Sequence, residues 1–253
     1  MIRRAKSADL RPIVQEARVR DKLSNLPPLP SFLGQVAPTG RAEVTVRLLT
    51  TDDIDRLEQT HERTRTMMPK GVVAHDDRAF LLERIRHGVA LGYLSGEEII
   101  AYGLLGLPDQ PGGELGRLIA DASLHTRPVG ELDGVGVLPE WQGNGLHFEM
   151  LAWRIRAATT LGRRDALATV SPDNLYSLPN MLRAALAARA LVQMPHGAWR
   201  YVMHHDGTDR AGQDGVWLPL SDFDAQKDAF AHGARGTALR TTATGPEIFL
   251  TNG

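Results

Sequence analysis

Val135-Gly-Val-Leu-Pro-Glu-Trp-Gln-Gly-Asn-Gly-Leu-His147 is the most informative stretch of this chain, because it predicts a strand that turns through glycines directly into a helix. The first N–H groups of a helix lack partners within the helix and lie at the positive end of its dipole. Gly143 and Gly145 leave the backbone bare, so a phosphate can approach it closely. The stretch therefore predicts an anion site, and a phosphorylated cofactor is the first hypothesis.

The composition limits the classes of protein to which the chain can belong. Its 253 residues are 42% hydrophobic, with 29 Lys plus Arg against 30 Asp plus Glu, so no electrostatic footprint for nucleic acid is present. It contains no cysteine, which excludes disulfides, a thiolate nucleophile and thiolate metal ligands. No apolar stretch has the length of a membrane span or a signal sequence. We expect a cytoplasmic enzyme or binding protein that uses no metal and associates with neither nucleic acid nor membranes.

The pattern of apolar residues predicts three parts along the chain. Residues 1–40 predict a short amphipathic helix followed by a proline-rich connector. Residues 41–206 predict a compact domain, in which a hairpin turns at Ser95-Gly96-Glu97 and strands later alternate with helices. The predicted strands cover residues 43–50, 89–95, 98–107, 131–139, 165–171 and 199–206, and the predicted helices cover residues 52–65, 76–88, 145–162 and 177–190.

This order predicts a mixed, mostly antiparallel α/β sheet of about seven strands with helices on both faces. The hairpin argues for antiparallel pairing, and the later strand-helix-strand unit argues for one parallel crossover. Residues 207–253 add three short strand patterns and one helix pattern, with too few apolar positions for a core of their own. We expect this extension to pack on the domain or on the other subunit of a homodimer.

The glycine-rich turn resembles that of the GCN5-related N-acetyltransferase (GNAT) family, in which Gln/Arg-x-x-Gly-x-Gly/Ala follows a strand that ends in Val-x-Pro. Here Val137-Leu-Pro139 and Gln142-Gly-Asn-Gly145 match that pattern, and the element order from residue 43 to about 206 matches the family. The resemblance implies a GNAT-like fold that binds acetyl-CoA. His147 departs from the pattern, because the family has a small residue there.

The resemblance also implies which residues contact acetyl-CoA. Its pantetheine arm would run along Val135 and Val137 like an added strand. Asn174 matches a family asparagine and would bind the pantetheine, although simple helix capping is the alternative. The pyrophosphate would lie on the backbone N–H groups of Gln142, Gly143, Asn144, Gly145 and Leu146. His147, the next residue, could crowd the phosphate, point away from it or donate to it.

Amine acylation needs a neutral amine, and therefore a carboxylate that accepts its proton directly or through water. Glu131 is the first candidate, because it lies six residues before Val137, where many relatives carry a general base. Period-two alternation predicts that Glu131, Asp133, Val135 and Val137 share one face of a strand. The alternative is that both acids are ordinary surface charges.

The leaving CoA thiolate needs a proton, which the family often takes from a tyrosine on the helix after the fifth strand. That position falls on Met181, which has no proton to donate. Tyr176 and Ser177 are the nearby donors, and water is a further alternative. The backbone N–H of Val137 is the expected contact for the oxygen that becomes negative in the reaction.

The residues and the resemblance together predict transfer of an acetyl group from acetyl-CoA to a primary amine of a small molecule, by direct attack in a ternary complex. Two alternatives keep the same site: a protein lysine acetyltransferase, and a non-catalytic sensor or assembly module that binds acyl-CoA. An acyltransferase that uses aminoacyl-tRNA is disfavoured by the charge balance. The binding site for the acceptor amine would be formed by residues 60–80 and 194–200, and their sequence indicates no particular amine.

Overall fold

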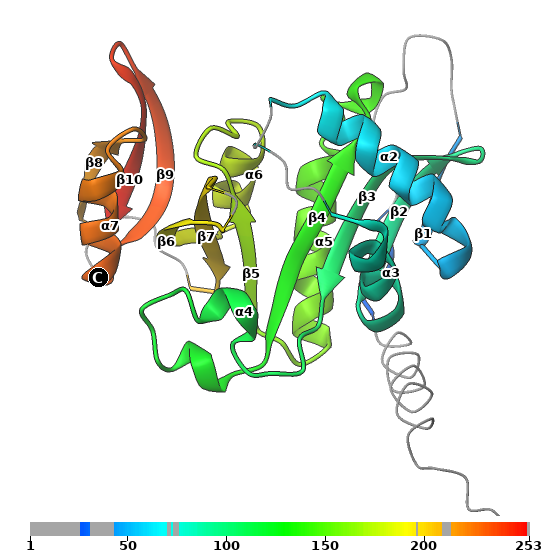
Figure 1. Ribbon diagram of the computed structural model, residues 1–253, viewed down its shortest axis with the longest axis horizontal. Coiled ribbons are helices and arrows are strands. Elements are labelled where there is room, and N and C mark those ends of the chain that lie inside the picture. Colours follow the sequence, from blue (N-terminus) through cyan, green and yellow to red (C-terminus); the bar gives the residue numbers. More distant parts are fainter. Residues whose placement is uncertain are drawn as a thin grey trace, which may run out of the picture.

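The computed structural model describes residues 26–30, 43–69, 72, 76–195, 197–208 and 214–251. The helix predicted over residues 8–22 and most of the predicted connector lie outside these ranges. Within them, one sheet runs in the order β1-β2-β3-β4-β5-β7-β6-β9-β10-β8 (Figure 1). Its strands are β1 (Val44–Leu48), β2 (Val89–Ser95), β3 (Glu98–Gly106), β4 (Val129–Val137), β5 (Asp165–Val170), β6 (Ala187–Gln193), β7 (Trp199–His205), β8 (Gly215–Pro219), β9 (Arg235–Thr242) and β10 (Gly245–Thr251).

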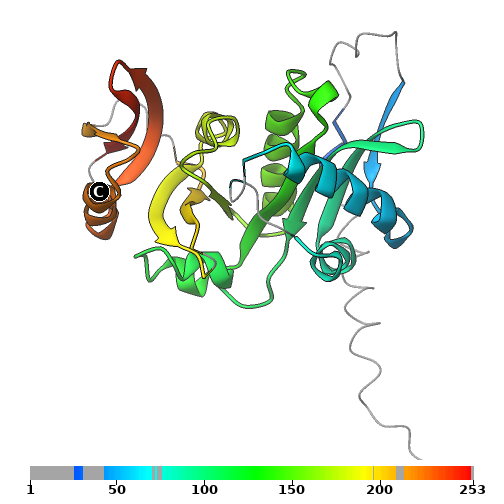
Figure 2. The same ribbon diagram turned by 45° about the horizontal axis from the view of Figure 1, so that its top comes forward.

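Helices cover both faces of the sheet, as the sequence predicts. Figures 1 and 2 show α2 and α3 on one side of the central strands and α5 on the other. Leu57 and Leu81 build one apolar cluster beneath the first pair, whereas Trp153 belongs to the larger cluster beneath α5. The helices are α2 (Ile54–Thr66), α3 (Arg78–His87), α4 (Gly113–Gly116), α5 (Leu146–Thr160), α6 (Ser177–Arg183) and α7 (Phe223–Ala231).

Strand pairing confirms the predicted mixture of directions. β2 and β3 form an antiparallel hairpin, and Gly96 at its turn has a φ of 59° that suits glycine. β4 and β5 run parallel, with α5 as the crossover between them. The remaining neighbours pair antiparallel, so the sheet is mixed and mostly antiparallel.

The helix predicted over residues 177–190 is correct only in its first half. α6 ends at Arg183, Ala185 takes a φ of 61°, and the chain then enters β6. The alanines there favour a helix locally. Pairing with β7 overrides that preference, because Ala187 and Ala188 are buried between the neighbouring strand and the helices.

The C-terminal residues enlarge the sheet from about seven strands to ten. β9 pairs with β6 only at Gly236 and Ala188, and the attachment also includes contacts of α7 with β6 and of β9 with α6. The hydroxyl of Tyr201 donates to Gln226 on α7, and Phe223 packs against Trp199. In Figure 1 this unit, coloured orange to red, continues the sheet at the edge beyond β6.

Residues 26–30 are held against α5 by one tryptophan. The indole Nε1–H of Trp153 donates to the Pro28 carbonyl at 3.0 Å, and Leu26 packs against the main apolar cluster. The Trp153 side chain is completely buried. The proline-rich segment is therefore anchored at this point to the helix that begins at the glycine-rich turn.

We expect Trp153→Phe to lower the free energy of unfolding by about 0.5–1.5 kcal/mol, because the hydrogen bond to the Pro28 carbonyl is lost, and Pro28 is exposed to water that can replace the donor. Urea denaturation followed by far-UV circular dichroism measures this change. Trp217→Phe is the matched control, since Trp217 contacts Phe249 on the C-terminal strands and lies far from α5. Equal stability of Trp153→Phe and the unmutated protein would show that the indole does not anchor the segment.

Candidate active site

The sheet opens between β4 and β5, and this opening locates the candidate site. The two strands pair only from Val129 to Glu131 on β4, although β4 continues to Val137 and β5 to Val170. In Figure 1 they diverge toward α6. Over the rest of β4, the edge toward β5 has no strand partner among the described residues. An unpaired edge of this kind accepts an extended ligand through main-chain hydrogen bonds.

The glycine-rich turn lies at the wide end of this opening. Gly143 and Gly145 have φ values of 82° and 75°, and a Cβ atom at either would meet no other atom within 4 Å. The N–H groups from Gly143 to Phe148 have no acceptor among the residues described. The Asn144 side chain donates to the Trp141 carbonyl and fixes the turn. The turn therefore presents free N–H groups at the start of a 15-residue helix, which suits a phosphate.

His147 lies against α6. Its Nε2 is 3.4 Å from the Ser177 hydroxyl, and its Nδ1 is buried with no partner among the described residues. Burial, helped by the charge of Arg154, lowers the pKa of His147 to about 4. The ring is therefore neutral at physiological pH and adds no positive charge to the turn, whereas its backbone N–H remains free for a phosphate.

Asn174 caps α6 through its side chain. Its Oδ1 accepts from the N–H of Ser177 at 3.0 Å, which is the capping contact that the sequence left as the alternative. The amide Nδ2 has no acceptor in the described part of the chain, so it can also bind a pantetheine. Tyr176 has 78% of its surface exposed, and Met181 is buried in the core. Of the two predicted proton donors, Ser177 is the one in polar contact with the turn helix.

A bulge in β4 makes the predicted alternation wrong. Val135 of β4 pairs with Gly103 and Leu132 pairs with Leu105, so two β4 residues, Asp133 and Gly134, lie opposite one β3 residue. The extra residue places the side chains at alternate positions before the bulge on the opposite face of β4 from those after it. Glu131 and Asp133 lie on the side of α3 and α4, whereas Val135 and Val137 pack with the cluster on the α5 side. Val137 also lies beside the glycine-rich turn, where Gln142 Nε2 donates to its carbonyl.

Glu131 lies at the point where β4 and β5 separate. It is 6% exposed, and its Oε1 accepts from the backbone N–H groups of Glu114 and Leu115 at 3.2 and 3.4 Å. Its Oε2 is 3.9 Å from Arg84 Nη2. Burial raises the pKa of Glu131 above its usual value, and the two N–H groups and Arg84 oppose that shift. The surface-charge alternative for this residue is therefore wrong.

Asp133 forms an ion pair with Arg84 on α3. Its side chain is 14% exposed, and burial raises its pKa to about 7 although the Arg84 charge opposes the shift. Glu131 adds to the rise through like-charge repulsion. Two acids with raised pKa values beside one arginine form a site suited to proton transfer near neutral pH. The sequence did not reveal Arg84, because a helical pattern does not show which strand an arginine will reach.

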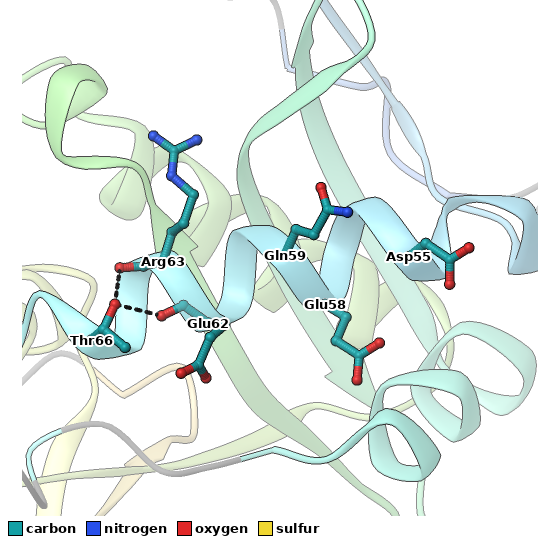
Figure 3. Close-up of a pocket in the computed structure, with 6 residues that line it drawn as sticks. All are labelled: Asp55, Glu58, Gln59, Glu62, Arg63 and Thr66. Carbon is teal, nitrogen blue, oxygen red and sulfur yellow. Dashed lines mark hydrogen bonds between the residues drawn. The ribbon is translucent and has the colours of Figure 1, made fainter.

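The outer face of α2 carries a separate open groove of about 700 Å³. Its lining consists of Asp55, Glu58, Gln59, Glu62, Arg63 and Thr66 (Figure 3). Arg78 forms ion pairs with Asp55 and Glu58 there, and Thr66 donates to the backbone of its own helix. The opposite side of α2, including His61, packs toward the sheet. This groove is therefore not part of the opening between β4 and β5.

Two further findings describe what the folded residues lack. In the ranges that the structure covers, no three His, Asp or Glu side chains come together in a group that could hold a metal ion. None of the helices in those ranges combines the length and apolar character needed to cross a membrane.

A model of the acetyltransferase (GNAT) family matches residues 52–183, which are 132 of the 253 residues. The matched range includes the glycine-rich turn, β4 and all of α6. No curated protein matches the chain.

Several solved structures with the same fold are N-acetyltransferases. Arabidopsis thaliana NAA60 in complex with acetyl-CoA has 16% identity and a TM-score of 0.52, covering 64% of this chain and 98% of its own. The Drosophila melanogaster polyamine N-acetyltransferase has 15% identity and a TM-score of 0.50, covering 64% of this chain and 100% of its own. An N-acetyltransferase from Staphylococcus aureus Mu50 has 9% identity and a TM-score of 0.50, covering 65% of this chain and 98% of its own.

Proposed function

Since the chain belongs to the GNAT family of acetyltransferases, we propose that it transfers the acetyl group of acetyl-CoA to a primary amine of a small molecule by direct attack. The observation that carries this proposal is the opening between β4 and β5. It has a turn of free N–H groups at its wide end and the buried acids Glu131 and Asp133 beside its narrow end. A phosphorylated, extended cofactor fits this arrangement.

Different residues of the opening would bind different parts of acetyl-CoA. The N–H groups from Gly143 to His147 would hold the pyrophosphate. The unpaired edge of β4 up to Val137 would hydrogen-bond the pantetheine arm, and Asn174 Nδ2 would donate to it from the opposite side. The arm then runs down the opening toward the last β4–β5 pair, at Glu131. The thioester would end near the two acids, which is where an amine must lose its proton.

Acetyl transfer would then begin with loss of a proton from the amine and attack on the thioester. Glu131 takes a proton from the ammonium, directly or through water, and the amine nitrogen forms a bond to the thioester carbon. The newly bonded nitrogen releases its second proton to water, and the carbon–sulfur bond breaks. The CoA thiolate takes a proton from Ser177 or water, and a Ser177 that has given its proton recovers one from water. Asp133 and Arg84 set the charge around Glu131. Val137 lies at the wide end of the opening, whereas the thioester would lie near its narrow end. We therefore place the contact for the negative oxygen at the bulge of β4 and not at the backbone N–H of Val137.

A small acceptor is favoured by the burial of both acids between α3 and α4. The acceptor segments expected from the sequence, residues 60–80 and 194–200, lie partly outside the described residues. The purified protein should release free thiol from acetyl-CoA in the presence of at least one amine in a panel of polyamines, arylalkylamines, amino acids and lysine peptides. Tight CoA binding by calorimetry without thiol release would favour the sensor alternative, and absence of CoA binding would reject both.

The rate should rise with pH through about 7. Burial raises the pKa of Asp133 to about 7, so this acid is increasingly protonated below neutral pH. Burial also raises the pKa of Glu131, so Glu131 becomes protonated at a higher pH than an ordinary glutamate does. A protonated acid accepts no proton, so kcat/KM falls as pH decreases, with an apparent pKa that belongs to the pair. A kcat/KM profile from pH 5 to 9 measures it.

Arg84→Met should move that profile to higher pH, because the Arg84 charge lowers the pKa values of both acids. We expect a shift of about one pH unit or more. Arg86→Met is the control on the same helix, since the arginine that pairs with the two acids in the described part of the chain is Arg84 and not Arg86. An unchanged profile in Arg84→Met would mean that neither acid controls the rate.

A further inference from the structure

Arg154 on α5 is a buried cation without an acidic partner. It is 1% exposed, and no carboxylate of the described residues lies within ion-pair distance of it. Its Nη1 donates to the carbonyls of Leu104 at 2.8 Å and Asp133 at 3.1 Å, and its Nε donates to the Met150 carbonyl at 3.3 Å. The Nη2 group has no acceptor in the described structure. A buried charge with no carboxylate at ion-pair distance is costly, so it calls for an explanation.

The chain makes room for this guanidinium at the bulge of β4. A Cβ atom on Gly103 would lie 3.0 Å from Arg154 Nε and 3.2 Å from its Cζ, so only glycine fits there without a shift. The carbonyl that Arg154 binds on β4 belongs to Asp133, one of the two bulged residues. The guanidinium therefore lies beside the point where β4 stops pairing with β5.

α5 connects this guanidinium to the phosphate turn. Arg154 follows Leu146, the first residue of α5, by eight residues, a rise of about 12 Å along the helix axis. An extended arm that starts at the turn and runs down the opening travels in the direction of Arg154. The thioester end of acetyl-CoA should therefore arrive at the level of the bulge.

We propose that Arg154 Nη2 donates to the carbonyl oxygen of the acetyl thioester and stabilises the negative charge that this oxygen gains when the amine attacks. The inference rests on the proposed function and adds to it the residue that contacts the reacting oxygen. The guanidinium is held in place before acetyl-CoA arrives, because three backbone carbonyls already fix its other nitrogens. Such preorganised donors act most strongly where water is excluded.

The experiment compares acetyl-CoA with S-ethyl-CoA, which has the same chain length but a CH2 group in place of the carbonyl, as ligands for the unmutated protein and for Arg154→Lys. Lysine keeps the charge and can still donate to the bulge carbonyls, but it lacks the Nη2 group. Arg156→Met is the control, because Arg156 lies on the same helix and is exposed. Calorimetry measures both affinities, and stopped-assay kinetics measure kcat.

We expect the unmutated protein and Arg156→Met to bind acetyl-CoA roughly tenfold more tightly than S-ethyl-CoA. Arg154→Lys should bind both ligands about equally and lose roughly a hundredfold in kcat. The infrared carbonyl band of bound ¹³C-acetyl-CoA should move to lower frequency in the unmutated protein and not in the variant. Gly103→Ala, which displaces the guanidinium without removing it, should reproduce the loss of preference if Arg154→Lys does not fold.

An unchanged tenfold preference and an unchanged infrared shift in folded Arg154→Lys would overturn the inference while leaving the proposed function intact. Equal losses of affinity for both ligands would also overturn it, because they would place the contact away from the thioester. If the unmutated protein bound neither ligand, the proposed function itself would fail, and the inference with it.

Discussion

Glu131→Gln should lower kcat by about 10²–10⁴-fold, with little change in the affinity for acetyl-CoA. The amide has the same shape as the carboxylate, and its oxygen can still accept from the N–H groups of Glu114 and Leu115. It cannot take a proton from an ammonium at neutral pH. Thiol release with saturating amine measures kcat, and calorimetry with acetyl-CoA measures the affinity.

Two further variants separate the possible outcomes of this experiment. Glu98→Gln removes a carboxylate that pairs with Arg63 on the surface, so it should keep full activity. Asp133→Asn removes the acid that pairs with Arg84. Full activity in Glu131→Gln together with a large loss in Asp133→Asn would make Asp133 the base and contradict the assignment that the sequence favoured.

Gly145→Val should weaken acetyl-CoA binding by roughly a hundredfold. Gly145 has a φ of 75°, where a β-branched residue is strained by about 1–3 kcal/mol. The side chain would also occupy the open space beside the free N–H groups, where we place the pyrophosphate. Because each 1.4 kcal/mol is worth a factor of ten, a loss of roughly 3 kcal/mol in phosphate contacts gives the expected factor. Calorimetry with acetyl-CoA and with CoA measures the change.

Gly162→Val is the control for backbone strain. Gly162 lies just beyond the other end of α5, has a φ of 79° and is surrounded by similar open space. The two variants should lose comparable amounts of stability in urea denaturation, but Gly162→Val should bind acetyl-CoA normally. Equal affinities of Gly145→Val and the unmutated protein would show that the turn does not bind the pyrophosphate.

Local patterns were sufficient for most of the elements. The alternation in β1, the Ser95-Gly96-Glu97 hairpin and the glycine turn before α5 are set by residues close together in the chain, and the structure confirms all three. The second half of the helix predicted over residues 177–190 was wrong, because pairing with β7 decides the state of β6. Its alanines carry a helical preference that a buried strand can override.

Part of the candidate site could likewise be predicted from the sequence, and part could not. The turn from Gln142 to His147 was predicted from the sequence, and so was Glu131 as an acid six residues before Val137. The bulge at Asp133 and Gly134 was not predicted, because a bulge depends on how β4 pairs with β3. It moves Glu131 and Asp133 to the face opposite Val135 and Val137.

The sequence by itself determined the order of elements in the domain, the glycine-rich turn proposed to bind an anion and the candidate base, because each depends on residues adjacent in the chain. Only the tertiary structure decided the environment of that base and the contacts of Arg84 and Arg154. Arg84 reaches Asp133 from 49 residues away and Arg154 reaches Leu104 from 50 residues away. Burial, and therefore the raised pKa values of both acids, arises from surfaces that meet only when the sheet and helices pack together.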